Sequence, residues 1–281
     1  MTTTLRPEGP ETPTAAGGRT RRWRILSNGH PVGTLRTTST PYGGQLWGEI
    51  SELEVTEGRG RGRGTFGALA AEEVLRHWGC VRVDARIPES APIARALAAT
   101  LGYTERMRTL NKRLTDAPAL PAGLTARPIE AAALQAWLDG GAERFAHSLV
   151  ASGLTEEQAR AKSGGDRRNL LPQGAETPGA VLSSLYDAAG GSEPCGSIWV
   201  ALHLRDLPDG EPLAWVMVVE VLPGHRGRGH GRALMLLAER ECLAAGVRNL
   251  GLNVFADNEI AIRLYDSLGY SATERLYGKA L

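Results

Sequence analysis

An internal repeat constrains this chain of 281 residues more than any other feature. With a constant offset of 167 and no gaps, residues 59–114 align with residues 226–281, and about a third of the aligned positions are identical. The identical positions include a glycine- and arginine-rich loop, a later turn glycine and a Leu-Gly-Tyr segment that occurs at 101–103 and at 268–270. Apolar positions keep the same register to the last residue. We therefore expect two copies of one domain.

Each copy is predicted to contain a strand, the loop, a helix, a second strand, a short helix and terminal strands. In the second copy, residues 213–222 form a nearly continuous apolar run, which is typical of a strand buried on both faces. The helix after the loop should stop at Gly246, and a strand should follow over 247–255. Asp257 is expected to cap the short helix, with Ser90 at the matching position of the first copy. The pattern predicts an α/β chain with an α+β mixed sheet.

The segments that precede the two copies differ in length. The first copy follows only three strand-like runs, at 23–27, 32–38 and 46–55, of which the first two are joined by Asn28-Gly29, a favourable hairpin turn. The second copy follows a strand, a helix with glycines in its middle, a capping box and two more strands, at 124–129, 130–151, 155–158, 181–186 and 195–204. We expect a disordered leader over 1–20, a shortened domain over 21–114, a linker over 115–123 and a complete domain over 124–281.

Composition excludes several classes of protein. Thirty-two basic and thirty-one acidic residues leave a net charge of +1, so no general attraction to nucleic acid or to an anionic membrane is expected. The longest apolar run, residues 213–222, is too short to span a bilayer as a helix. Cys80, Cys195 and Cys242 are odd in number and widely spaced, which argues against disulfides and against a zinc site. With no secretory signal apparent, we expect a cytoplasmic protein.

The loop of the first copy is open to two interpretations that involve no acyl transfer. Gly62, Gly64 and Gly67 follow a strand and open a helix, with Asp84 further on, which is the outline of an NAD-binding fingerprint. The second copy argues against NAD because Leu234 replaces the third glycine. Alternatively, the glycines only permit a tight turn and the arginines are solvated.

The loop of the second copy supports a third interpretation. Residues 226–231 fit the pattern R-x-x-G-x-G and directly follow the strand that ends near Leu222. Backbone N–H groups at a helix N-terminus, left accessible by glycine and assisted by arginine, bind pyrophosphate. This pattern resembles the coenzyme A loop of the GNAT acetyltransferase superfamily. The resemblance continues through Leu252-Asn253-Val254, Asn258, Leu264-Tyr265 and Gly269-Tyr270, and it covers 124–281 in full and 22–114 as a partial copy.

The resemblance implies two tandem GNAT-like domains, with acetyl-CoA as co-substrate and no metal. The implied activity is N-acetyl transfer to a primary amine, with a small molecule as the expected acceptor, by direct transfer in a ternary complex. It also implies the cofactor contacts: the Val221 backbone N–H would bind the thioester carbonyl, Asn258 the pantetheine arm, and the loop the pyrophosphate. The loop residues concerned are Arg226, Gly227, Arg228, Gly229, His230, Gly231 and Arg232.

Two side chains are candidates for proton transfer. Tyr265 lies seven residues after Asn258, two helical turns on, so the two share a face, and the resemblance implies that Tyr265 protonates the coenzyme A sulfur. A core tyrosine is the alternative. Glu220, at the strand end, is the candidate base, directly or through water, unless it is an ordinary strand-end carboxylate. Asn253 either contacts the cofactor or orders the strand, and His230 is expected to contribute mainly its backbone N–H.

The first copy lacks both candidate side chains of the last helix. Ala91 stands at the position of Asn258 and Ala98 at that of Tyr265, so we expect one active site, in the second copy, and we expect the two copies to pack on each other. One alternative is a non-catalytic acyl-CoA sensor or scaffold. Another is an enzyme like mycothiol synthase, a tandem member of the superfamily, which the shortened first copy fits less well.

Overall fold

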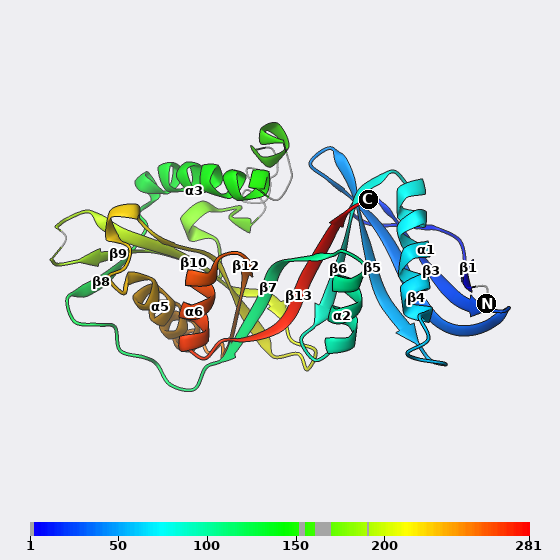
Figure 1. The fold of residues 1–281 in the computed structure, drawn as a ribbon. Helices are drawn as coiled ribbons and strands as arrows, with labels where there is room; N and C mark the ends of the chain where they lie inside the picture. The colour runs from blue at the N-terminus through cyan, green and yellow to red at the C-terminus, as the bar shows by residue number, and fades with distance from the viewer. Residues whose placement is uncertain (1–2, 152–154, 161–169, 190) are drawn as a thin grey trace. The chain divides into compact units, whose positions relative to one another are not determined.

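The computed structural model describes residues 3–151, 155–160, 170–189 and 191–281, and the chain divides into two compact units. Unit 1 contains the chain up to Arg108 together with Thr273–Leu281, and unit 2 contains Thr109–Ala272. Both units combine strands with helices, and parallel and antiparallel strand pairs occur in each (Figure 1). The predicted α/β class with a mixed sheet is confirmed.

Unit 1 is a sheet with the strand order β1-β3-β4-β5-β6-β13, with β2 paired to β3. Helices α1 and α2 contribute Leu75 and Ala98 to the core cluster of this unit, which is built on β3, β4, β5 and β6. The elements are β1 (Thr3–Pro7), β2 (Thr12–Pro13), β3 (Arg19–Ser27), β4 (His30–Tyr42), β5 (Gln45–Val55), α1 (Arg63–His77), β6 (Cys80–Pro88), α2 (Pro92–Thr100) and β13 (Ser271–Ala280).

The leader expected to be disordered contains structure instead. Strand β1 pairs antiparallel with β3, from Thr3 opposite Ser27 to Pro7 opposite Trp23, and Leu5 packs against the core cluster of unit 1. The Thr/Pro/Gly-rich composition suggested disorder, but strand pairing uses backbone groups and needs only one apolar side chain here. By contrast, the predicted hairpin after β3 is present, with Asn28 at φ 50° and Gly29 at φ 82°.

Unit 2 is a sheet with the strand order β7-β12-β11-β10-β9-β8. Helix α3 lies on one face of this sheet and α5 and α6 lie on the other (Figure 1). No helix among the described residues combines the length and hydropathy that crossing a bilayer requires. The elements are β7 (Thr104–Arg113), β8 (Leu124–Pro128), α3 (Ala131–Ala151), η1 (Gly174–Glu176), β9 (Ala180–Asp187), β10 (Pro194–Asp206), β11 (Pro212–Val221), η2 (Pro223–His225), α5 (His230–Ala244), β12 (Asn249–Phe255) and α6 (Glu259–Ser267).

The capping predictions were right at one helix and off by one residue at another. At 155–158 the capping box is formed by two reciprocal hydrogen bonds: the Thr155 backbone N–H donates to Gln158, and the Gln158 N–H donates to the Thr155 hydroxyl. At α6 the cap is Asn258 and not Asp257, because the Asn258 side chain accepts from the Ala261 N–H at 3.2 Å. The matching cap in the first copy is therefore Ala91 rather than Ser90, and it offers no side-chain bond.

A β-bulge opens the sheet of unit 2 on one side of β11. Trp199 of β10 lies opposite Val218 and Val200 lies opposite Val216, so Met217 is an extra residue in β11. The parallel pairing of β11 with β12 runs from Leu213 to Val216, although β11 continues to Val221. A bulge bends its strand and ends local pairing. The last five residues of β11 consequently diverge from β12.

The terminal strands of the two repeat copies are exchanged between the units. The repeat suggested that each copy keeps its own last strand. Instead β13, from the second copy, pairs antiparallel with β6 of unit 1, from Glu274 opposite Pro88 to Ala280 opposite Arg82. Reciprocally, β7, from the first copy, lies beside β12, and from Thr109 onward it belongs to unit 2. The compact units thus differ from the ranges 21–114 and 124–281, and residues 115–123 fall inside unit 2.

Two buried glutamate–lysine pairs accompany this exchange. In unit 2 the Lys112 ammonium of β7 lies 2.7 Å from the Glu239 carboxylate of α5, whose side chain is 4% exposed. In unit 1 the Lys279 ammonium of β13 lies 2.9 Å from the Glu72 carboxylate of α1, whose side chain is 1% exposed. Both pairs are related by the repeat offset. Each buried carboxylate is therefore neutralised by a lysine from the other repeat copy.

Candidate active site

The glycine-rich loop of the second copy connects β11 to α5 and presents the N-terminus of that helix. Gly229 is the N-cap of α5, in the left-handed conformation at φ 82°, and Gly227 is at φ 77°. A Cβ built at either position would have no atom within 4 Å, so both glycines border open space. The first N–H groups of an α-helix have no partner inside the helix. The loop thus fits an anionic group such as a pyrophosphate.

Gly231 marks the point where three elements of the site meet. A Cβ at Gly231 would lie 3.2 Å from the Leu264 side chain of α6 and 3.8 Å from the Val221 side chain of β11. Because Gly231 does not have a positive φ, close packing explains the glycine here and backbone conformation does not. The start of α5, the middle of α6 and the end of β11 are therefore in contact, as the predicted site requires.

The backbone of Val221 is oriented toward the open side of β11. The N–H of the next residue, Leu222, donates to the Cys195 carbonyl of β10 at 3.0 Å. Backbone groups alternate sides along a strand, so the Val221 N–H points away from β10, to the side from which β12 has diverged. This orientation leaves the Val221 N–H directed at the gap between the end of β11 and β12.

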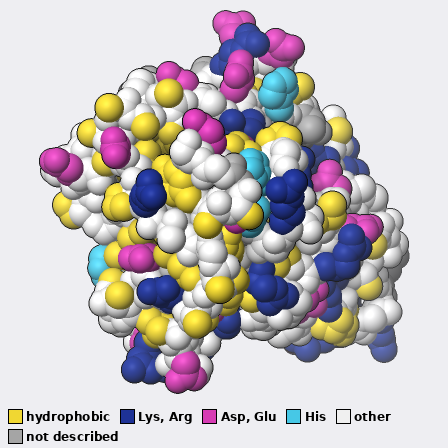
Figure 2. Space-filling view, turned by 90° about the vertical axis from the view of Figure 1, so that its left-hand side faces the viewer, with side chains coloured by type: hydrophobic (Ala, Val, Ile, Leu, Met, Phe, Trp, Pro, Cys, Tyr) yellow, Lys and Arg dark blue, Asp and Glu magenta, His cyan; other side chains and the backbone are white. Residues whose placement is uncertain are grey.

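Two of the three loop arginines bind other protein groups, although all three were expected to contact the cofactor. Arg226 donates to the Val221 carbonyl at 3.3 Å, and Arg232 donates to the Ser267 hydroxyl of α6 at 2.6 Å. Both therefore brace the site, while Arg228 is exposed in the loop. Figure 2 shows Lys and Arg side chains interspersed with Asp and Glu side chains on the face turned toward the viewer.

The two asparagines of the predicted site have protein partners as well. Asn253 is exposed on β12, just past the last residue paired with β11, and its side-chain oxygen accepts from the Thr109 hydroxyl at 3.0 Å. Asn258 uses its oxygen to cap α6, which leaves its amide N–H groups to donate. Both positions are compatible with cofactor contact, and both also order local backbone.

Tyr265 lies on α6 next to Leu264, with only 5% of its surface exposed. Its ring packs edge-on against Tyr270, with the ring centres 6.0 Å apart. Burial raises the pKa of Tyr265 to about 12, so the phenol is protonated at neutral pH. A protonated phenol can donate a proton but cannot act as a base.

Glu220 lies at the end of β11 and borders a cavity of about 200 Å³ beneath α3. Its carboxylate, in a side chain that is 13% exposed, forms an ion pair with Arg144 of α3. Trp137 of α3 donates its indole N–H to the Ser197 hydroxyl of β10 at 2.8 Å in the same wall. The cavity is lined by Ala136, Trp137, Gly140, Arg144, Ser184, Pro194, Gly196, Ser197, Glu220 and Leu222.

Gly140 explains how this cavity is kept open. A glycine inside a helix costs about 1 kcal/mol relative to alanine, yet Gly140 lies in the middle of α3. A Cβ there would lie 3.2 Å from the Arg144 guanidinium and would project into the cavity that Gly140 lines. The mid-helix glycine therefore leaves room for Arg144 to fold back along the helix toward Glu220.

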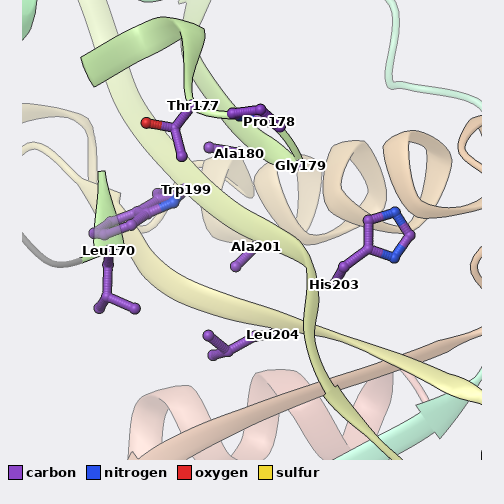
Figure 3. A pocket seen from close by; sticks show the side chains of 9 residues that line it. All are labelled: Leu170, Thr177, Pro178, Gly179, Ala180, Trp199, Ala201, His203 and Leu204. Carbon is purple, nitrogen blue, oxygen red and sulfur yellow. The ribbon is translucent and has the colours of Figure 1, made fainter. Parts of the chain in front are cut away.

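A second cavity, of about 140 Å³, lies on the same face of the sheet (Figure 3). Leu170, Trp199 and His203 are among its lining residues, and it includes neither Glu220 nor the loop. It does not reach the residues predicted to transfer protons. The cavity beneath α3 is therefore the better candidate for the acceptor.

Comparison with known proteins agrees with this geometry. The family model of the acetyltransferase (GNAT) family matches residues 165–270. The mycothiol acetyltransferase of Thermomonospora curvata is 31% identical over 266 residues, which cover 92% of this chain and 81% of that protein. The chain belongs to the GNAT family of acetyltransferases. Acetyl-CoA is the acetyl donor of this family.

Further relatives show how far the likeness extends. The mycothiol acetyltransferase of Streptomyces scabiei is 34% identical over 226 residues, 77% of this chain, but this chain spans only 65% of that protein. A GCN5-related N-acetyltransferase from Sphaerobacter thermophilus has the same fold, with a TM-score of 0.57 and 21% identity over 92% of this chain and 80% of that one. This GNAT chain therefore resembles the mycothiol acetyltransferases in sequence, and the likeness to the Streptomyces relative covers 65% of that protein.

Several residues of the site escaped the sequence analysis. Arg144 and Trp137 carried no motif, although the glycines in the middle of the predicted helix were a visible signal. The His230 side chain, expected to matter little, is buried at 2% exposure and contacts Asp187 of β9. Asp187 carried no signal in the sequence, because strand β9 reaches the loop only through the tertiary fold.

Proposed function

We propose that this protein is an acetyl-CoA-dependent N-acetyltransferase that acts on a primary amine of a small molecule at one active site, in unit 2. The observation that carries the proposal is the convergence at Gly231 of the loop, the end of β11 and α6, next to the cavity that contains Glu220. The loop supplies helix N–H groups for the pyrophosphate, and the diverging end of β11 supplies the Val221 N–H.

This arrangement supports direct transfer in a ternary complex. The amine nitrogen attacks the thioester carbonyl carbon, a C–N bond forms and the C–S bond breaks. The Val221 N–H stabilises the developing oxyanion, Glu220 accepts the amine proton directly or through water, and Tyr265 protonates the departing sulfur. Burial raises the pKa of Tyr265 to about 12, so its hydroxyl carries a proton at neutral pH.

The acceptor site is the cavity beneath α3. Its volume of about 200 Å³ suits a small molecule, and its polar groups are Glu220, Arg144 and two serines. Arg144 donates hydrogen bonds and cannot accept them, so an acceptor that binds beside Glu220 is expected to present oxygen atoms to Arg144. Arginine here favours a polar, oxygen-bearing amine over a purely aliphatic one.

A mycothiol-related amine is the second, more specific candidate. The shortened first copy argued against a mycothiol synthase at the level of sequence, but the similarity to mycothiol acetyltransferases over up to 92% of this chain favours it. We propose such an amine as the first acceptor to test.

The first copy is proposed to support the second rather than to catalyse. Its loop is built in the same way: Arg59 donates to the Val55 carbonyl at 2.8 Å, as Arg226 does to Val221. It has Ala98 in place of Tyr265, and among the described residues 3–58 that precede its loop there are strands but no equivalent of α3. We therefore propose that it lacks the proton donor and the helix that forms the acceptor wall.

The deciding experiment measures binding and turnover together. Calorimetry with acetyl-CoA, coenzyme A and NAD tests the cofactor, and thiol release with a panel of amines, including a mycothiol-related one, tests the reaction. We expect binding of acetyl-CoA and acetylation of at least one polar amine, identified by mass spectrometry. Binding without turnover on any amine would favour the acyl-CoA sensor, and binding of NAD alone would refute the proposal.

A further inference from the structure

The buried side chain of His230 packs under the proposed coenzyme A loop. Its ring is 2% exposed, and its two nitrogens contact two different elements. Nδ1 lies 3.0 Å from the backbone carbonyl oxygen of His225, and Nε2 lies 3.1 Å from the Asp187 carboxylate at the end of β9. His225 directly precedes the loop and His230 lies near its end, so this one side chain connects the two parts of the loop and attaches them to β9.

The chemistry of the two partners defines the charge of the ring. A backbone carbonyl only accepts hydrogen bonds, and so does an ionised carboxylate. The pKa of Asp187 is lowered, first by the Ala189 backbone N–H that donates to it and then by His230, so the carboxylate is ionised. An imidazole donates from both nitrogens only when it is protonated. The geometry therefore fits an imidazolium.

Among the described residues, the other groups around His230 do not accept a hydrogen bond from its ring. The His225 ring lies 6.0 Å from it, centre to centre. Arg228 of the loop interacts electrostatically with Asp187, and the buried thiol of Cys195 on β10 is neutral because burial raises its pKa. Asp187 is accordingly the counter-ion of the His230 ring.

The first repeat copy closes its loop in a similar way with a permanent cation. Arg63, which aligns with His230, donates from its guanidinium to the Glu57 carbonyl at 2.6 Å. Gly58 makes room for this contact, because a Cβ there would lie 2.4 Å from the guanidinium. In both copies, the side chain of the first residue of the helix contacts a backbone carbonyl that precedes the loop: Arg63 contacts Glu57, and His230 contacts His225. In the second copy this donor is titratable.

We propose that His230 is a positioning residue of the coenzyme A site, and that its imidazolium holds the loop in shape and adds positive charge beneath the pyrophosphate. The proposal rests on the proposed function, since it takes the loop to be the acetyl-CoA site. It predicts that affinity for acetyl-CoA decreases as pH rises and the ring loses its proton. The His230 side chain does not touch the ligand, unlike its backbone N–H, and it does not take part in the chemical step.

The test is calorimetry of acetyl-CoA binding between about pH 5.5 and about pH 8.5, the range in which histidine titrates. The His230→Asn variant places an amide where Nδ1 lies, so it keeps the bond to the His225 carbonyl but cannot gain charge. The His225→Asn variant is the matched control, because it removes a nearby ring and leaves the backbone carbonyl in place. Titration of the ligand's own phosphate affects all variants equally.

As pH rises over this range, the affinity of the wild type for acetyl-CoA should fall about tenfold more than that of His230→Asn, the equivalent of about 1.4 kcal/mol. The His225→Asn variant should show the same pH dependence as the wild type. His230→Ala should bind about tenfold more weakly than the wild type at low pH. If His230→Asn fails to fold, Asp187→Asn, which removes the counter-ion, should also lose the pH dependence. Superimposable profiles for the wild type and His230→Asn, or a profile flattened by His225→Asn, would overturn the inference. A wild type that binds no acetyl-CoA at any pH would overturn the proposed function as well.

Discussion

Replacing Lys112 with methionine should destabilise the unit that contains the second copy's loop, although Lys112 belongs to the first copy. Methionine keeps the apolar stem of lysine and removes the ammonium that lies 2.7 Å from Glu239. The carboxylate would then remain in α5 with 4% of its side chain exposed and without its counter-ion. The perturbation therefore isolates the charge that the exchanged strand contributes.

The expected magnitude is about 3 kcal/mol, the lower end of the cost of removing one partner from a buried ion pair. The lower end applies because Lys112 is 22% exposed, so some water reaches the pair. For a unit of this size each kcal/mol shifts Tm by about 2–4 °C, which gives a decrease of about 6–12 °C. The double variant Lys112→Met with Glu239→Met should recover most of this loss, because a well-packed apolar pair replaces a buried ion pair at little cost.

The assay is hydrogen exchange followed by mass spectrometry, with thermal denaturation for the magnitude. Lys112→Met should accelerate exchange in α5 and leave α1 protected, and the matched variant Lys279→Met should do the reverse through Glu72. Faster exchange in α1 than in α5 for Lys112→Met would refute the exchanged assignment of the strands. A fragment that starts at residue 120 lacks β7 altogether and is expected to be insoluble for the same reason.

Three further predictions concern the active site. Tyr265→Phe should keep acetyl-CoA affinity and lower turnover by about 10- to 1,000-fold in a thiol-release assay. Because burial raises the Tyr265 pKa to about 12, loss of its proton should not reduce wild-type activity below about pH 10. An unaltered turnover number in the variant would mean that Tyr265 only packs in the core. Gly140→Ala should raise the KM for the acceptor and leave acetyl-CoA binding unchanged, because the added Cβ would lie 3.2 Å from the Arg144 guanidinium. The free energy of unfolding should rise by up to about 1 kcal/mol, because alanine is the better helix former. An unchanged KM would show that the acceptor binds elsewhere. Gly231→Val should abolish turnover because a Cβ at this position would lie 3.2 Å from the Leu264 side chain. Gly64→Val, the equivalent change in the first copy, should leave most turnover per folded molecule. Substantial activity in a folded Gly231→Val variant would show that the first copy is itself an enzyme.

The glycine-rich loop and its strand and helix could be predicted because their signals are local. Gly229 caps α5 in a left-handed conformation, and the apolar run at 213–222 forms β11. Such features depend on neighbouring residues in the chain, where backbone conformation and hydrophobic periodicity act directly. The internal repeat added the boundaries, because the same elements had to occur twice.

The acceptor cavity and the anchor of the loop could not be predicted, because each joins residues far apart in the chain. Arg144 meets Glu220 across 76 positions, and His230 meets Asp187 across 43. Arg144 and Asp187 look like ordinary surface residues in the sequence. Only packing of α3 and β9 against the strands that carry the site places them beside Glu220 and His230.

The sequence by itself determined that the chain contains a duplicated GNAT-like domain with one complete set of candidate catalytic residues. It did not determine which terminal strand completes which sheet. Lys112 and Lys279 stand at equivalent positions of the repeat, as do Glu72 and Glu239, so either lysine could chemically neutralise either glutamate. A sheet accepts a strand through backbone pairing and burial of one face, and neither depends on the copy from which the strand comes. The exchange of the terminal strands was therefore decided only by the tertiary structure, in which β13 pairs with β6 and β7 lies beside β12.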